Sequence, residues 1–295
     1  RDGRVNPERN KYDRPLLGKM SQAVGTLGLA YYLTDDERYA AHAAKLLRVW
    51  FLEPATRMNP NLNYAQFIRG INDGRGIGII DSVSLLSVVD GIGMIHGSPA
   101  WTPADHAGMT AWFREYLTWL RTSKNGKDEA AAANNHGSWY DVQVATFALF
   151  VGEDDAYVKK LLEEAKTKRI ARQIEPDGRQ PLELKRTKAF DYSQTNLRAL
   201  FALATLGDRV GVDLWRYETA DGRSIRKALD WLIPFATGEK KWEHEQITGL
   251  RGASLATLLR RAAVAYHDEH YEGLVDKLSG LRETGTMNLL YPNPR

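Results

Sequence analysis

Cysteine is absent from this 295-residue chain. Its absence excludes disulfides, thiolate nucleophiles and cysteine-ligated zinc sites. It fits an exported bacterial protein as well as a cytosolic one, so cysteine usage leaves the compartment open. The first four residues, RDGR, do not resemble a signal peptide, so any leader has been removed or was never present.

Long apolar runs and an excess of one charge are also lacking. No run approaches the roughly 20 residues that a membrane-spanning helix needs, so we expect no membrane span. The 40 basic and 37 acidic residues leave a net charge of only +3. That balance argues against a nucleic-acid binder with a uniformly basic face, and we expect no nucleic-acid partner.

Local basic clusters remain possible despite the balanced total. Lys185, Arg186 and Lys188 form one group, and Lys240 and Lys241 stand beside Trp242. Basic side chains that alternate with aromatic ones suit an anionic sugar chain as well as a nucleic acid. Solvated helix ends explain short basic runs equally well.

Hydrophobic residues and tryptophan are plentiful. Hydrophobic residues make up 43% of the chain, which includes 8 tryptophans. A chain of this length and composition buries a large core, and its length allows one large domain or two small ones.

Apolar residues recur every three or four positions over most of the chain, which predicts helices. The predicted helices cover residues 16–33, 37–50, 76–95, 103–120, 138–150, 154–174, 192–206, 225–235 and 254–268. No alternating β-branched run is long enough to predict a large sheet, and no fixed period indicates a repeat array. The pattern therefore predicts an all-α protein of helical hairpins, arranged as an α/α toroid or as an irregular bundle.

Three predicted loops carry most of the polar chemistry. Residues 54–75 show no clear period, and loops of that length in compact domains are commonly functional. We interpret this segment as a lid that covers a substrate, because it is rich in amides and aromatics. Residues 175–187 form the second loop, and residues 124–133 form a polar connector into the next segment.

That next segment, residues 134–141, reads NNHGSWYD and is the most informative stretch. A helix C-cap followed by a new N-cap explains one or two adjacent asparagines. It leaves His136 and the two aromatic residues unexplained. The density of directional polar groups favours a site for a polar ligand.

Several motifs together resemble the alginate lyase superfamily of polysaccharide lyases. They are NNHGSWY at 134–140, LELKRTK at 182–188, Tyr192-Ser193, Val5-Asn6-Pro7, MNPNLNYAQ at 58–66, GRGIG at 74–78 and NLLYP at 288–292. The resemblance runs nearly end to end and is strongest to the branch with glucuronan and mannuronan lyases. It implies a single (α/α) toroid domain over residues 1–295, with long cleft-lining loops. It also implies an enzyme that needs no metal, and we expect no other cofactor. We further expect a monomer with a periplasmic or secreted location.

The resemblance implies cleavage of a β-1,4-linked anionic uronan, polymannuronate (alginate) or glucuronan, by β-elimination. By position, Asn135, His136 and Arg186 would neutralise the substrate carboxylate and stabilise the enolate-like charge that develops. Tyr192 would be the acid and also the base, and the nearby positive charge of Arg186 would favour its phenolate. Asp191 and not histidine precedes Tyr192, and the spacing around Arg186 differs from the family pattern.

Further residues are predicted to bind the substrate. They are Asn63, Tyr64, Gln66, Arg75, Asn134, Trp139, Lys188 and Lys241. Trp139 is equally explained by core packing. The HDEH sequence at 267–270 lacks the spacing of a zinc helix, so we expect no metal site there.

Two alternatives remain open at this stage. A glycoside hydrolase on the same toroid would need two carboxylates about 5–10 Å apart, for which Glu183 and Asp191 are the candidates. A noncatalytic uronan-binding protein would need the basic and aromatic residues but not the Asn-His-Tyr set.

Overall fold

The computed structural model describes residues 2–4, 6–153, 155–279 and 287–292. Two positions used in the sequence interpretation lie outside these described residues. They are Val5, in the Val5-Asn6-Pro7 motif, and residue 154, at the start of a predicted helix. The chain divides into two compact units. Unit 1 comprises residues 1–4, 133–138 and 159–295, and unit 2 comprises residues 5–132 and 139–158.

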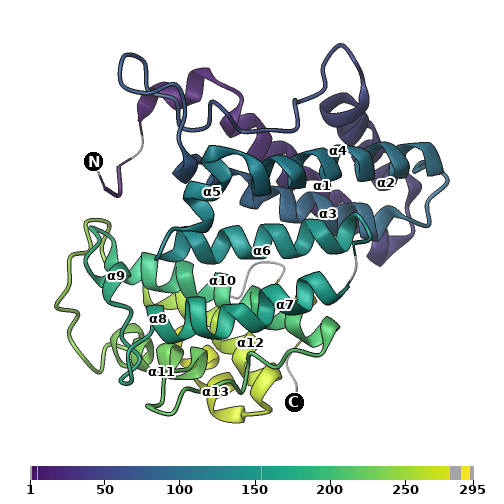
Figure 1. The fold of residues 1–295 in the computed structure, drawn as a ribbon. Coiled ribbons are helices and arrows are strands. Elements are labelled where there is room, and N and C mark those ends of the chain that lie inside the picture. Colours follow the sequence, from purple (N-terminus) through teal and green to yellow (C-terminus); the bar gives the residue numbers. More distant parts are fainter. Residues whose placement is uncertain (1, 5, 154, 280–286, 293–295) are drawn as a thin grey trace. The chain divides into compact units, whose positions relative to one another are not determined.

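Unit 2 is built on a pair of helices, α1 (Arg14–Thr34) and α3 (Leu85–Ile95), which pack along each other (Figure 1). The other elements of this part are α2 (Glu37–Leu47), α4 (Pro103–Thr122), α5 (Lys124–Ala130), the π-helical turn Arg48–Leu52, and the 3-10 segments Pro7–Lys11 and Gly76–Ser84. Helix α6 (Asn135–Phe150) begins in unit 1 and continues in unit 2, and α7 (Asp155–Ala165) begins in unit 2 and continues in unit 1.

Aromatic rings fill the core of unit 2. Phe51, Trp112, Phe113, Tyr116 and Phe147 are all buried. The ring centroids of Phe51 and Trp112 lie 4.8 Å apart, and those of Phe113 and Phe147 lie 4.9 Å apart. Edge-to-face and tilted pairs at this spacing add to the free energy of burial, so this core is well fixed.

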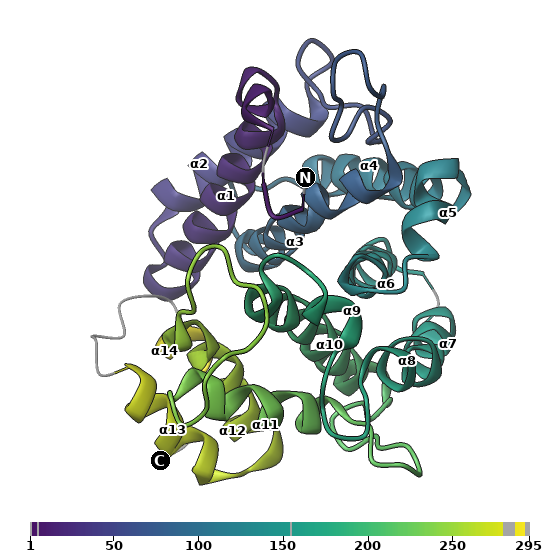
Figure 2. The same ribbon diagram turned by 90° about the vertical axis from the view of Figure 1, so that its left-hand side faces the viewer.

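Unit 1 is organised around the 22-residue helix α10 (Ala189–Val210). Twelve of its residues are buried, and it contacts α9 (Pro181–Leu184) and α11 (Ile225–Ala236). Helices α12 (Ala256–Tyr266) and α13 (Glu269–Ser279) form a hairpin beside α11 (Figure 2). The remaining elements are the π-helical turn Lys166–Ile170, α8 (Ala171–Gln173), the 3-10 turn Gly252–Leu255 and α14 (Met287–Leu290).

The structure agrees with most predicted helices and corrects several boundaries. The connector at 124–133 is wrong as a loop, because it contains α5. Helix α6 begins at Asn135 and not at 138, so most of the NNHGSWYD segment is helical. Helix α10 begins at Ala189, ahead of Tyr192, and α9 interrupts the predicted loop at 175–187. Helices α13 and α14 were not predicted. Over the described residues no strand forms, and pairing is limited to two isolated bridges.

The prediction that no apolar run approaches the length of a membrane-spanning helix is wrong. Residues Gly76–Ile95 are long and apolar enough to cross a membrane by length and composition. In the structure this stretch starts as a 3-10 helix and continues as α3, whose Leu85, Val88, Ile92 and Ile95 are buried. Because α3 packs against α1, the segment behaves as a core helix of unit 2.

Candidate active site

The predicted site begins where α6 starts. Asn134 precedes the helix, and its Oδ1 accepts a hydrogen bond from the backbone N–H of His136 at 3.3 Å. Its backbone carbonyl also accepts from Gly137 N–H at 3.0 Å. The capping interpretation therefore explains Asn134, while His136 is half-buried in the first turn of α6.

Asn135 is buried and is held by a carboxylate. Its backbone N–H donates to Glu183 Oε1 at 2.7 Å, and its Nδ2 donates to Glu183 Oε1 and Oε2 at 2.9 and 2.8 Å. Both residues are 2% exposed or less. Three hydrogen bonds to one carboxylate fix the position and the orientation of the Asn135 amide.

Burial decides the protonation tendency of Glu183. Its pKa is raised because burial disfavours the carboxylate, although the hydrogen bonds from Asn135 and the charge of Arg186 oppose this effect. A carboxyl with both oxygens held inside the protein is poorly placed to protonate a glycosidic oxygen. This geometry disfavours Glu183 as the acid of a glycoside hydrolase.

Arg186 lies between Glu183 and Tyr192. Its Nε donates to both oxygens of Asp2 at 3.0 Å, and its Nη2 donates to Asp2 Oδ1 at 2.6 Å. Its Nη1 lies 3.7 Å from Glu183 Oε2. The guanidinium carbon stands 3.8 Å from the centroid of the Tyr192 ring, so the cation covers one face of the phenol.

The Tyr192 phenol is half-buried. Its pKa is raised because burial disfavours the phenolate, and the charges of Asp2 and Glu183 add to this increase. The Arg186 cation acts in the opposite direction but is outweighed. The expectation that positive charge would favour the phenolate has the right sign for Arg186, yet the net direction is wrong because it omitted burial.

Buried amides link α6 to α10 through α8 and α9. Ser138 Oγ and Asn196 Nδ2 both donate to Gln173 Oε1, at 2.9 and 3.0 Å. Asn196 Nδ2 also donates to Gln180 Oε1 at 2.9 Å, and Gln180 Nε2 donates to the Ser193 carbonyl at 3.2 Å. All five side chains are buried. This connected set holds the first turn of α6 in register with the residue that follows Tyr192.

A second support comes from the loop after α11. Phe190 N–H donates to Gln246 Oε1 at 3.0 Å, and Thr248 Oγ1 donates to Asp191 Oδ2 at 3.2 Å. Lys188 and Gln246 also form an isolated antiparallel bridge. The start of α10 is therefore tied to residues 245–248.

The two predicted lysines lie on this part of unit 1. Lys188 is half-buried and immediately precedes α10, whereas Lys241 is exposed in the loop after α11. Next to Lys241, the ring of Trp242 packs against Phe190 and Phe235 with centroids 5.3 and 5.1 Å apart. Trp242 thus serves packing, and it anchors the loop that carries Lys241.

The predicted lid residues belong to unit 2, and their contacts are within that unit. Asn63 Oδ1 accepts from Trp119 Nε1 at 2.9 Å, and Gln66 Oε1 accepts from Arg75 Nη2 at 2.9 Å. Tyr64 is 74% exposed. The segment is largely irregular, as predicted, and Gly74 at φ +131° permits a close approach to the Asn63 carbonyl. Trp139 is half-buried on α6 in the same unit. Their contribution to substrate binding stays a prediction.

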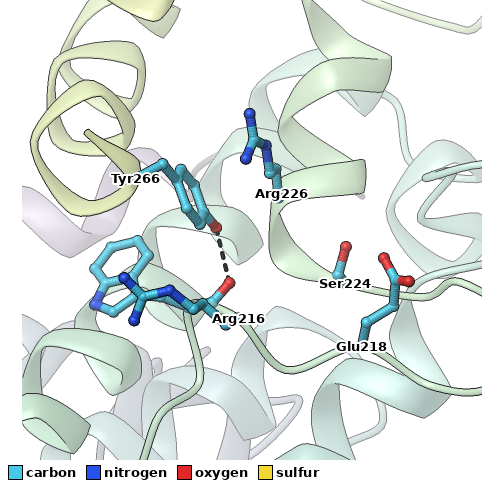
Figure 3. Close-up of a pocket in the computed structure, with 6 residues that line it drawn as sticks. Arg216, Glu218, Ser224, Arg226 and Tyr266 are labelled. Atoms are coloured by element: carbon cyan, nitrogen blue, oxygen red, sulfur yellow. Dashed lines mark hydrogen bonds between the residues drawn. The ribbon is translucent and has the colours of Figure 1, made fainter. Parts of the chain in front are cut away.

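A separate cavity of about 270 Å³ lies in unit 1, and none of the predicted site residues lines it (Figure 3). Its lining residues are Trp215, Arg216, Glu218, Ser224, Arg226 and Tyr266. Tyr266 Oη donates to the Trp215 carbonyl at 3.2 Å, and Arg226 is paired with Asp268. Within the described ranges, no group of three or more histidine and carboxylate side chains is arranged to hold a metal ion.

Sequence reasoning misses two contributors to this site, Asp2 and Gln246. It predicts Glu183 only as a carboxylate of a hydrolase, whereas in the structure Glu183 accepts hydrogen bonds from Asn135. The one available signal was the Asp2-Gly3 pair, since such pairs mark turns with positive φ, and Gly3 has φ +68°.

Comparisons with known proteins identify the family of this chain. The alginate lyase family model matches residues 1–242. An alginate lyase from Bacteroides ovatus is 40% identical, with a TM-score of 0.95, over 99% of this chain and 78% of that one. A search of curated proteins found no match.

More distant structures show the same fold. A variant of alginate lyase A1-III complexed with a tetrasaccharide has 18% identity and a TM-score of 0.71, over 99% of this chain and 80% of that chain. A second A1-III variant, also complexed with a tetrasaccharide, has 16% identity and a TM-score of 0.66, over 97% of this chain and 85% of that chain. These likenesses confirm the all-α fold class of the (α/α) toroid type. From the family match and the 40% identity, the chain belongs to the alginate lyase family of polysaccharide lyases.

Proposed function

We propose that this protein cleaves a β-1,4-linked polyuronate, polymannuronate (alginate) or glucuronan, by β-elimination. One observation carries the proposal. Asn135, Glu183, Arg186 and Tyr192 form one connected set in unit 1, from an amide through a carboxylate and a guanidinium to a phenol. Family membership makes a lyase the expected enzyme class, and this set contains groups suited to the reaction.

The first requirement is to reduce the negative charge of the substrate carboxylate, so that the proton on C5 becomes acidic. We assign this task to Asn135, His136 and Arg186. Their amide, imidazole and guanidinium groups would stabilise the enolate-like charge in the transition state. The hydrogen bonds to Glu183 hold the Asn135 amide in one orientation at the start of α6.

The second requirement is proton transfer, which we assign to Tyr192. Its phenolate oxygen would take the C5 proton, the C4–O4 bond would break as the C4=C5 double bond forms, and the phenol would return the proton to O4. In β-linked mannuronate or glucuronate the C5 proton and O4 lie on the same side, so one residue can do both. In guluronate they are on opposite sides, and His136 would have to be the base.

The geometry favours elimination over hydrolysis. A hydrolase would need Glu183 and Asp191 as an accessible pair. Glu183 is 1% exposed with both oxygens bonded to Asn135, and Asp191 accepts from Thr248. We therefore expect an Asp191→Asn variant to keep lyase activity.

Ultraviolet absorbance during incubation with polymannuronate, polyguluronate and glucuronan tests the reaction directly. A rising signal from the conjugated unsaturated end supports elimination and identifies the polymer. New reducing ends without that signal would show hydrolysis. No reaction with any of the three polymers would contradict the proposed substrate class.

Tyr192→Phe tests the assigned role of the phenol. Phenylalanine keeps the ring under Arg186 but cannot carry the proton, so we expect kcat to fall by about 10²–10⁴-fold or more with oligosaccharide binding retained. Tyr217→Phe is the matched control, because Lys166 also lies over its ring, with Nζ 5.7 Å from the centroid. Full activity of the Tyr192→Phe variant would refute the mechanism. Monomeric state and a periplasmic or secreted location stay predictions.

A further inference from the structure

Asp2 carries the further inference, which rests on the proposed function. We propose that Asp2 is a positioning residue, which holds the Arg186 guanidinium flat over the Tyr192 ring. Arg186 would then meet the substrate carboxylate from a fixed position beside the phenol.

The donors of Arg186 support this assignment. Nε and Nη2 form a fork on the Asp2 carboxylate, and Nη1 faces Glu183 at 3.7 Å. A carboxylate and a guanidinium in this fork geometry fix each other in orientation as well as distance. With its hydrogen-bonding edge turned toward Asp2, the guanidinium presents its flat face to Tyr192, 3.8 Å from the ring centroid.

Further hydrogen bonds fix the side chain of Asp2 in place. Its Oδ2 also accepts from Thr187 N–H at 2.9 Å and from Thr187 Oγ1 at 3.3 Å. The hydrogen bonds from Arg186, followed by those from Thr187, hold the pKa of Asp2 well below its usual range. The carboxylate is thus charged at any pH at which the enzyme would act.

Gly3 allows Asp2 to reach Thr187 and Arg186. It has φ +68°, and a Cβ atom there would collide with Thr187 Oγ1 and crowd Lys188 and Ile247. Only glycine combines that backbone conformation with so close an approach. Residues 2 and 3 are therefore fitted to residues 186–188, which directly precede α10.

Steady-state kinetics of Asp2→Ala tests the proposal. We expect kcat to fall by at least about tenfold while KM stays within about twofold, because a group that acts through Arg186 and Tyr192 affects the transition state more than substrate binding. Asp2→Asn, which keeps one acceptor, should lose less. Gly3→Ala should reproduce the loss while keeping both Asp2 and Arg186.

Asp36→Ala is the matched control. Asp36 accepts from Nε of Arg38 at 3.0 Å on both oxygens and from Nη2 at 2.5 Å, in the same fork, at the exposed start of α2. This substitution should leave kcat and KM unchanged. A double-mutant cycle completes the kinetic test, since Asp2→Ala should have no further effect on kcat in an Arg186→Ala background.

Other outcomes would overturn the proposal. Kinetics equal to those of the Asp36→Ala variant would mean that Asp2 only ties down its own segment. A lower KM or a higher rate would mean that the Asp2 carboxylate competes with substrate for Arg186. An additive double-mutant cycle would mean that Asp2 acts independently of Arg186.

A crystal structure of the Asp2→Ala variant gives a readout that does not depend on the substrate. We expect the Arg186 guanidinium to leave the Tyr192 ring, and its persistence over the ring would refute the positioning role. Failure of the proposed function would be recognised separately, as a wild-type protein that releases no unsaturated product.

Discussion

Tyr192 shows how one residue balances opposed influences. Burial raises the pKa of its phenol, whereas the Arg186 cation, 3.8 Å from the ring centroid, lowers it. The net increase means that the phenol of the free protein is protonated at neutral pH. It is ready to act as an acid, and it must lose its proton before it can act as a base.

This balance predicts a pH dependence. If Tyr192 is the base on polymannuronate, kcat/KM should rise about tenfold per pH unit through neutral pH and beyond, because the phenolate fraction grows at that rate below the raised pKa of the phenol. Arg186→Ala should move this rise of kcat/KM to higher pH, since the Arg186 cation lowers the pKa of Tyr192. The measurement is the pH profile of kcat/KM for both proteins.

A different profile would identify a different base. A plateau already reached near neutral pH would contradict Tyr192 as the base on polymannuronate, because the phenolate fraction of Tyr192 is still growing there. Comparison with polyguluronate provides the internal control, because its anti geometry already requires a second residue.

At this scale the sequence indicated which side chains to consider but not their partners. Asn135, His136, Arg186 and Tyr192 stand in short motifs that can be read directly. Asp2 is 184 residues from Arg186, and no local pattern predicts a pair at that separation. The raised pKa of Tyr192 was equally inaccessible, because burial depends on tertiary packing.

Among the elements, the long helices were predictable because their apolar period is strong. The short ones were not. Helix α5 contains a glycine and four charged residues in seven, so its local propensity is weak. It forms because Ser123 caps it and because Gly126 packs against the Leu120 carbonyl where no side chain would fit. Such support becomes visible only in three dimensions.

The start of α4 offers a test of element stability. Thr102 and Asp105 form a capping box, and Asp105 also pairs with Arg48 at 2.8 and 2.6 Å. We expect Asp105→Asn to lower the free energy of unfolding by about 1–2 kcal/mol, because it removes a charge-assisted pair and one capping acceptor. Thermal or urea unfolding of the whole protein would measure the change.

The pH dependence of that change has a definite sign. Arg48 lowers the pKa of Asp105 from 3.8 to about 2, so its stabilising effect is complete above pH 3.8 and is lost as the pH falls toward 2. The difference between wild type and Asp105→Asn should therefore shrink across this interval. Asp36→Asn gives the comparison with an exposed pair, because Asp36 forms a similar fork with Arg38 at the surface, where water and salt weaken its effect. A difference that stayed constant down to pH 2 would contradict the role of the ion pair.

For the whole molecule, charge distribution matters more than net charge. The net charge is only +3, yet Lys185, Lys188, Lys240 and Lys241 lie near or within the segments tied to the start of α10.

The family fold was predictable from motifs that run along most of the chain. The relation of units 1 and 2 was not, because no local pattern encodes it, and the single-domain expectation stays a prediction.

Because these lysines gather near the start of α10, salt should weaken the binding of a polyanionic substrate. We expect KM for polymannuronate to rise at least about threefold between 0.05 and 0.5 M NaCl with little change in kcat, because salt screens exposed charges. A Lys188→Ala, Lys241→Ala double variant should show a flatter dependence, whereas Lys45→Ala on α2 should match the wild type. A KM that does not respond to salt would rule out a role for these lysines in attracting the polymer.

The 184-residue separation of Asp2 and Arg186 also matters during synthesis. At about 5–20 residues per second, a ribosome needs about 10–40 s after making Asp2 to reach Arg186. During that interval the early segment has no partner for its carboxylate, and Tyr192 does not yet exist. A site that needs Asp2, Arg186 and Tyr192 together can therefore be completed only after all the residues of unit 2 have been made.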